Sequence, residues 1–378
     1  MIHWPSAGVS HVATWCIAAA ATAAVIVRPG RWPEAVWAVG GALLLLLCGL
    51  ISISTALQAV VEGWDVYLFL VGMMLLSELA RREGLFDTLA GWAVRHAGGS
   101  ARRLFALVYG IGVVVTVFMS NDATAVVLTP AVYVVAKKAG AKPLPYLFAC
   151  AFIANAASFV LPISNPANLV VFGDHMPPLL AWLRAFVLPA IAAIVVTWAV
   201  LALLFRDELA APVESGSHVP KLSGTGRLAA VGIVGVVLAM LAASALGFPL
   251  GAPTLIAALV AIGGVQLSKR EAPWGLLQHV SWSVLALVAG LFVLVAGVVQ
   301  TGLVAGTAAN SGAMPDGVRS AIAIGIDLGP NLSATGSLAT ILWLVALRRE
   351  GEHVSAWQFL RVGIVAMPLA LVAALACL

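Results

Sequence analysis

Residues 116–124 have the sequence Thr-Val-Phe-Met-Ser-Asn-Asp-Ala-Thr and lie in the middle of the apolar run 104–136. That run is too long for one membrane helix, because about 20 apolar residues already cross a hydrocarbon core about 30 Å thick. Irregular backbone is stable at membrane depth only where it is buried in protein or lines a cavity. The polar residues Ser120, Asn121 and Asp122 therefore predict a broken helix, the element from which many transporters build their binding sites.

The composition of the whole chain is that of a protein with many membrane-spanning segments. Of its 378 residues, 62% are hydrophobic and only 10% are charged, and the mean hydropathy is +1.05. Soluble domains have about 25% charged and about 45–50% apolar residues. A chain with so little polar surface is neither a soluble enzyme nor a nucleic-acid-binding protein. The formal net charge of +4 comes from Lys and Arg in short loops, where such residues determine membrane topology.

Other apolar segments have the length of a membrane helix. We expect spans at 12–27, 34–53, 65–80, 186–205, 227–246, 250–267, 282–302 and 359–377. No Lys or Arg precedes the first span, so it lacks the basic start of a cleaved signal peptide and is expected to be retained. The loop charges favour an N-terminus on the outside, with Lys137, Lys138 and Lys142 as exceptions.

Two further apolar regions are interrupted by polar residues, Gly and Pro. Residues 145–173 are broken around Ser164 and Asn165, and residues 318–346 are broken around Asp327. We predict that each region forms a re-entrant hairpin, in which two short helices meet at membrane depth.

The sequence repeats itself across the hydrophilic linker 206–226. Residues 64–85 resemble residues 282–303 at an offset of 218, and residues 153–165 resemble residues 325–337 at an offset of 172. Inverted-topology repeats are a common architecture of secondary transporters. We therefore predict an all-α polytopic membrane protein with an inverted repeat, broken helices and two re-entrant hairpins. Its predicted parts are N-terminal transmembrane helices (1–53), a first repeat (54–205), the linker (206–226), a transmembrane helix pair (227–267) and a second repeat (268–378).

The second repeat is shorter than the first. The interval between the entry helix and the hairpin is 71 residues in the first half (84–155) and 25 in the second (302–327), a difference of 46. In the first half this interval contains a basic amphipathic arm (86–103) and the broken helix. The second half keeps only a short polar run, which cannot span a membrane. We therefore predict a truncated second repeat with an irregular loop over 304–318.

Two acids lie in the broken segments. A carboxylate inside a membrane is costly unless it is paired, hydrated or protonated, so Asp122 and Asp327 are candidate functional residues. For Asp122 we expect a proton-carrier role, with capping of the following helix as a compatible alternative. Asp327 is its counterpart in the second repeat, and capping of the hairpin tip is its alternative role.

Hydroxyl and amide side chains accompany these acids. Such groups suit a small neutral polyol-like solute or a sodium ion better than a large anion. Hydrogen bonding between helices is the alternative role for each of them. The predicted substrate-binding or proton-binding residues are Ser120, Asn121, Asp122, Thr124, Asn155, Ser164, Asn165, Asn168, Asp327, Asn331, Ser333, Thr335 and Ser337.

The cysteines give no pattern for a metal site or a disulfide. Cys16, Cys48, Cys150 and Cys377 are widely spaced and form neither a CxxC pair nor a His/Cys cluster. A single Cys in a membrane helix is usually a small packing residue. We expect no cofactor and no metal site, and we expect that the protein is not an enzyme.

Several motifs together resemble the arsenical-resistance efflux pump family, the arsenite and antimonite permeases of the ion-transporter superfamily. The motifs are Ser120–Pro130, Phe152–Ser158 followed by Ser164–Val170, and Asp327–Leu344. The resemblance covers nearly the whole chain. The family normally has a second broken helix before the Asp-Leu-Gly-Pro motif, and its absence here agrees with the shorter second repeat.

The resemblance implies export of trivalent arsenite or antimonite from the bacterial cytoplasm across the inner (plasma) membrane. Protons moving inward would drive this export. It also implies an elevator-like movement of the domain that holds both hairpins. Some family members work with a soluble ATPase partner. Membrane lipid surrounds such a chain, and a homo-oligomer is left open.

Two alternatives stay open on the sequence alone. One is a sodium-coupled carrier for a dicarboxylate or another oxyanion on the same fold, against which the scarcity of Lys and Arg at site depth argues. The other is a non-transporting truncated relic, for which the shortened second repeat argues.

Overall fold

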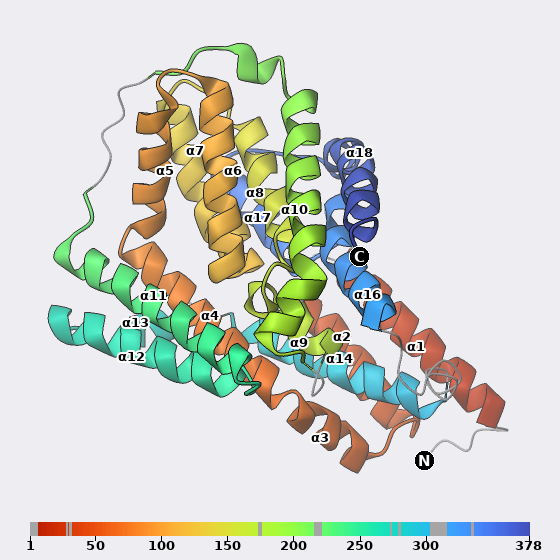
Figure 1. Ribbon diagram of the computed structural model, residues 1–378. Helices are drawn as coiled ribbons and strands as arrows, with labels where there is room; N and C mark the ends of the chain where they lie inside the picture. The colour runs from red at the N-terminus through yellow and green to blue at the C-terminus, as the bar shows by residue number, and fades with distance from the viewer. Residues whose placement is uncertain are drawn as a thin grey trace. The chain divides into compact units, whose positions relative to one another are not determined.

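The computed structural model describes residues 7–27, 29, 32–172, 176–214, 221–272, 274–278, 281–302, 316–333 and 336–378. The described part is helical, apart from turns and one isolated β-bridge between Ser100 and Pro212. Seven of the described helices are long and apolar enough to cross a membrane, or eight if the bent pair α3 (Ile53–Glu62) and α4 (Trp64–Arg82) forms one span. The predicted all-α, polytopic membrane protein is confirmed (Figure 1).

These long helices have apolar side chains on nearly every face. The seven are α1 (Ala7–Val27), α6 (Ala101–Phe118), α10 (Leu179–Leu204), α11 (Gly224–Ala245), α12 (Gly251–Lys269), α14 (Trp282–Gln300) and α18 (Ala356–Leu375). Leu188 on α10, Val231 on α11 and Val260 on α12 are each more than half exposed. A helix that is hydrophobic all round is stable in a bilayer, where lipid chains cover such residues.

Shorter helices complete the described structure. They are α2 (Glu34–Leu47), α5 (Leu85–Ala97), α7 (Thr129–Lys138), α8 (Leu144–Ala156), α9 (Pro166–Phe172), α13 (Trp274–Leu277), α16 (Asp316–Leu328) and α17 (Leu338–Arg349). The chain divides into two compact units. Unit 1 comprises residues 1–70 and 281–318, and unit 2 comprises residues 71–280 and 319–378. The chain passes between the units three times: within α4, between residues 280 and 281, and within α16.

Unit 1 is built around the contact of α14 with α2. Gly290 on α14 lies against the α2 backbone, where an added Cβ would come within 2.7 Å of the Ala38 carbonyl carbon. The close approach buries Leu45, Val293 and Leu294 between the helices.

Unit 2 contains both predicted hairpins. Its core includes an aromatic cluster in which Phe148 and Phe152 of α8 contact Trp343 of α17 and Phe359 of α18. The Trp343 indole Nε1 donates to Leu147 O at 3.0 Å, so the buried ring keeps no unpaired polar atom. This cluster fixes α8 and α17, the helices that carry the hairpin tips.

The helix bounds reproduce the internal repeat. α4 and α14 each contain 19 residues and start at the paired residues Trp64 and Trp282. α8 and α16 each contain 13 residues, and their bounds differ by the predicted offset. Gly72, the counterpart of Gly290, also lies against a backbone, since its Cβ would come within 3.0 Å of Leu255 N. The equivalent glycines of the two entry helices thus each allow a close approach to a neighbouring helix, which is α12 for Gly72 and α2 for Gly290.

The first repeat has helices that the second does not have room for. α5, α6 and α7 lie between α4 and α8, whereas residues 301–315 alone separate α14 from α16. Most of the predicted loop 304–318 lies outside the described residues. Its last residues, 316–318, are helical because α16 begins at Asp316, so the loop prediction is wrong there.

Two local predictions are corrected. The span expected at 34–53 ends at Leu47, because Gly49 adopts a φ of 66°, which stops the helix. The amphipathic arm expected at 86–103 is two elements. Its first part, α5, packs against α6 and α7 and buries Phe86 and Val94, and Ser100 caps the start of α6.

The linker places the ends of α5 and α7 together. Val213 N donates to Gly99 O at 3.0 Å, and Glu214 N donates to Ala139 O at 2.8 Å. Figure 1 shows the green segment after α10 passing over these helix ends. Lys138 at the end of α7 therefore lies at the same end of α5–α7 as the start of α6. The segment 104–136 therefore begins and ends on the same side. Lys137 and Lys138 then agree with the positive-inside rule and are no longer exceptions to it.

We predict that Gly290→Ala destabilises unit 1, because the new methyl group overlaps the α2 backbone. Overpacking of this kind costs about 1–3 kcal/mol of unfolding free energy. Tryptophan fluorescence during thermal unfolding in detergent measures the change. Gly40→Ala on α2 is the matched control, since nothing lies within 4 Å of its Cβ position. Equal stability of the two variants would contradict the proposed packing.

Candidate functional site

The predicted break in the helix is present at Ser120. α6 ends at Phe118, and Ser120 has a φ of 149°, a conformation that residues other than glycine rarely adopt. The following turns, Ala123–Leu128, form a π-helix before α7 begins. Strained backbone and π-helical turns are concentrated at functional sites. Together they mark this segment as a candidate site.

Hydroxyl groups stabilise the break from within. Ser120 Oγ accepts from Ala123 N at 3.3 Å, and the hydroxyls of Thr116 and Thr124 lie 2.8 Å apart. Asp122 makes no capping bond with its side chain and is partly exposed. The alternative that Asp122 caps the following helix is therefore wrong, because Ser120 supplies that cap.

The first hairpin consists of α8, an irregular loop and α9. Ser164 Oγ donates to Val117 O at 2.9 Å, which fastens the loop to the last turn of α6. Asn168 Nδ2 donates to Ser158 O at 3.0 Å inside the loop. Ser164 and Asn168 thus satisfy backbone carbonyls, so their first role is to hold the hairpin tip beside the break.

The second hairpin reaches the first through an amide pair. Asn155 Nδ2 donates to Asn331 Oδ1 at 2.9 Å, and Asn331 Nδ2 donates to Phe152 O at 3.1 Å. Asn331 lies in the 3₁₀ turn Gly329–Leu332 that follows α16. Gly363 of α18 allows this turn to approach, since a Cβ there would come within 3.1 Å of Leu332 Cα. Both amides are 1% exposed.

A carboxyl group forms the second link between the hairpins. Asn165 Nδ2 donates to Asp327 Oδ1 at 2.5 Å. Asp327 is 1% exposed, and its Oδ2 has no hydrogen-bond partner among the described residues. The sequence predicts Asn155, Asn165, Asp327 and Asn331 as site residues, and the structure brings these four together.

Other predicted residues have different positions. Ser337 accepts from Thr340 N at 3.1 Å and caps α17, and Ser333 is exposed. Thr335 lies outside the described residues. Ser158, which is not among the predicted site residues, is fully buried in the first hairpin and donates its hydroxyl to Asn155 O at 2.7 Å. Its position three residues after Asn155, in the turn that follows α8, is the signal that could have identified it.

The charged side chains at the site are acidic. Among the described buried polar residues there are Asp, Glu, Asn, Gln, Ser and Thr but no Lys or Arg. The described residues also contain no group of three His, Cys, Asp or Glu side chains that could hold a metal ion. The site can therefore offer hydrogen bonds and negative charge to a ligand.

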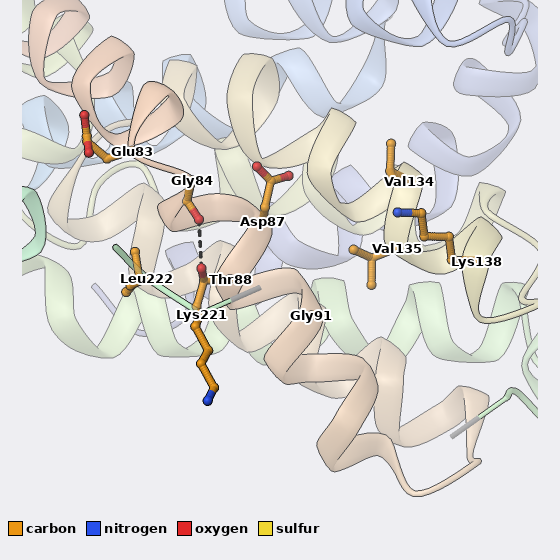
Figure 2. Close-up of a pocket in the computed structure, with 10 residues that line it drawn as sticks. All are labelled: Glu83, Gly84, Asp87, Thr88, Gly91, Val134, Val135, Lys138, Lys221 and Leu222. Carbon is orange, nitrogen blue, oxygen red and sulfur yellow. Dashed lines mark hydrogen bonds between the residues drawn. The ribbon is translucent and has the colours of Figure 1, made fainter. Parts of the chain in front are cut away.

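A pocket of about 250 Å³ lies elsewhere in unit 2, between α5, α7 and the end of the linker. Its charged lining residues are Glu83, Asp87, Lys138 and Lys221. Glu83 is ion-paired with Lys269. In Figure 2, Lys138 extends toward Asp87, whereas Lys221 points away from both. The lysines do not converge, so this pocket is no obvious anion site.

Comparisons with known proteins identify transporters. A family model described as a citrate transporter, CitMHS, matches residues 21–351. An uncharacterized transporter of Mycobacterium tuberculosis (strain CDC 1551 / Oshkosh) is 27% identical over 370 residues, covering 82% of this chain and 84% of that protein. The arsenical pump membrane protein of Escherichia coli is 24% identical over 378 residues, covering 86% of this chain and 88% of the pump. The expected similarity to arsenical pumps is present, although the matching family model is described as a citrate transporter.

The YdaH transporter of Alcanivorax borkumensis superposes with a TM-score of 0.49 at 16% identity, covering 85% of this chain and 86% of that one. A soluble ATPase partner and a homo-oligomer stay predictions.

We predict that the amide pair couples the two hairpins energetically. Asn155→Ala and Asn331→Ala should each cost about 1–3 kcal/mol, since each leaves a buried polar group unpaired. The double variant should cost less than the sum of the two, with a coupling of about 0.5–3 kcal/mol. Denaturant unfolding in mixed micelles measures all four proteins.

The exposed pair Gln58 and Glu62, joined at 3.0 Å on α3, provides the control cycle. Its coupling should not exceed about 0.5 kcal/mol. Additive effects at Asn155 and Asn331 would show that the pair does not hold the hairpins together.

Proposed function

The chain belongs to the CitMHS citrate transporter family, and on that premise we propose that it exports arsenite or antimonite from the bacterial cytoplasm in exchange for protons. It is a multi-pass bacterial membrane protein of the superfamily that also contains the arsenical pumps. The proposal concerns its substrate and its coupling ion.

The absence of Lys and Arg from the described buried polar residues is the observation that supports this substrate. A multivalent anion would enter hairpin tips that already contain the buried acid Asp327, with no buried cation to offset the repulsion. Arsenite is a neutral trihydroxide at neutral pH. Its hydroxyls can donate to carboxylate oxygens and accept from amides, which are the groups found at the hairpin tips.

Both hairpins belong to unit 2, so a site built from them would move with that unit in an elevator-like cycle. Asp122 is partly exposed beside the strained turn at Ser120. In this proposal Asp122 exchanges protons with water, because it is accessible and lies at a helix break.

A sodium-coupled carrier of citrate or another carboxylate is the second candidate. The description of the matching family favours it. It requires cationic groups that would have to come from outside the described buried residues.

Everted membrane vesicles from a host without its own arsenite pump test the proposal. With an acidic interior, vesicles containing the protein should accumulate labelled arsenite, and Asp122→Asn should reduce accumulation to the level of empty vesicles. The substitution keeps the size of the side chain and removes the titratable proton. Membrane levels of both proteins are compared by immunoblot.

Two results would reject the proposal, and one would reject only the proton role of Asp122. Sodium-dependent citrate accumulation without arsenite transport would favour the second candidate. Proton-driven arsenite transport that survives Asp122→Asn would remove the proton role of that residue. No transport of either substrate would favour the truncated relic.

We also predict that transport does not depend on thiols. Cys150 is buried, Cys48 is partly exposed, and Cys16 and Cys377 are exposed, with none in a disulfide or a described ligand group. A soft trivalent arsenic ion would require two or three converging thiolates. Replacing Cys150 by Ala and the others by Ser should therefore leave at least about half of the arsenite flux. Complete loss with normal membrane levels would instead show that transport needs a thiol, with the buried Cys150 as the first candidate.

A further inference from the structure

The corner between α5 and α6 carries three arginines without acidic partners. Arg95 lies in the last turn of α5, and Arg102 and Arg103 lie in the first turn of α6. Ser100 N donates to Ala97 O at 3.1 Å in the short turn between the helices, so the three arginines lie at the same end of the pair. All three are exposed, and none forms an ion pair with an acid among the described residues.

The acids of the adjoining segment do not neutralise this corner. The 3₁₀ turn Glu208–Ala210 packs on α6, but no ion pair of the described residues joins Glu208 to an arginine. Asp207 pairs with Arg206 at 3.6 Å, and Glu214 is held at the end of α7 by its N–H bond to Ala139 O. The helix dipole also disfavours cations in the first turn of α6. The corner therefore presents positive charge that the fold itself leaves uncompensated.

Arg103 continues an exposed apolar face of α6. Leu107, Val114 and Phe118 follow it at multiples of three or four residues and so lie on the same side of the helix. Val114 is 56% exposed and Phe118 is 37% exposed. In a bilayer such side chains are covered by acyl chains, and an arginine at the end of the apolar face extends its charged group toward the lipid headgroups.

Trp92 on α5 marks the same level of the membrane. It is 40% exposed, and Leu89, one turn earlier on the same face, is 38% exposed. The Trp92 ring packs against the imidazole of His96 with the centroids 4.4 Å apart, and His96 Nδ1 lies 2.9 Å from Trp92 O. Exposed tryptophans are enriched where acyl chains meet headgroups. An apolar face with an aromatic residue that ends in basic residues is typical of a helix lying in the membrane surface.

We propose that the α5–α6 corner, defined by Trp92, Arg95, Arg102 and Arg103, binds the headgroup of an anionic phospholipid. A guanidinium group pairs with a phosphate through two parallel hydrogen bonds, and each basic residue near the surface adds attraction to anionic lipid. A soluble acidic protein fits this corner less well, because the arginines are continuous with apolar faces that lipid chains cover. All four residues belong to unit 2, so the bound lipid attaches that unit to one leaflet.

Quenching of Trp92 fluorescence by brominated phospholipids tests the proposal on the purified full chain in liposomes. The signal of Trp92→Phe is subtracted, which isolates Trp92 from the other tryptophans. Brominated phosphatidylglycerol should bind beside Trp92 in preference to brominated phosphatidylcholine. Replacing Arg102 and Arg103 by Gln should lower this preference about fivefold for each arginine. Replacing both by Lys should keep most of it, because the charge remains.

Arg227→Gln is the matched control and should leave the preference unchanged, because Arg227 is also exposed near the start of a serine-capped helix. Equal quenching by the two lipids in the wild type, an unchanged preference in the glutamine double variant, or an equal loss in Arg227→Gln would overturn the proposal. If the double variant does not fold, Arg95→Gln on the other helix decides. A wild type that lacks the lipid preference but binds soluble polyglutamate through Arg102 and Arg103 would assign the corner to an acidic protein instead.

Discussion

A re-entrant hairpin brings the free polar groups of two helix ends into the membrane interior, where water cannot satisfy them. In this protein the two hairpins satisfy each other. The carboxamides of Asn155 and Asn331 pair directly, and Asn331 closes the arrangement on the carbonyl of Phe152. The aromatic cluster beneath them and the glycine at 363 make the close approach possible. This contact joins the two hairpin tips and so supports the position of Asp327 beside Asn165.

The same contact explains how a shortened second repeat can still fold. The second repeat has only residues 301–315 between α14 and α16, whereas the first repeat has α5, α6 and α7 between α4 and α8. The polar groups of the second hairpin instead form hydrogen bonds with the first hairpin, where Asn165 donates to Asp327. The two hairpins are therefore held in different ways. The first hairpin is fastened to its own break through Ser164, whereas the second depends on the partner repeat.

Local sequence patterns predicted the helices well, because apolar length and interruptions by Asn, Pro and Gly act over one or two turns. The repeat offsets were visible for the same reason, and they recur in the bounds of α4 with α14 and α8 with α16. Partners across the repeat were not predictable, since the choice of Asn165 for Asp327 depends on how segments distant in sequence pack. Capping of the break was considered as an alternative role for Asp122 and not for Ser120, because spacing alone does not reveal the left-handed φ that turns the serine hydroxyl toward Ala123 N.

The balance of charge at the hairpin tips also constrains the direction of coupling. The tips hold one buried acid, and the described buried residues include no base to neutralise it. An anionic substrate would bind most readily while Asp327 is protonated, so proton and substrate would travel together. A neutral substrate rich in hydroxyl donors would bind best after the proton has left, so the two would travel in opposite directions. Symport and antiport can therefore arise from one carboxyl group, and the charge and hydrogen-bonding groups of the substrate select between them.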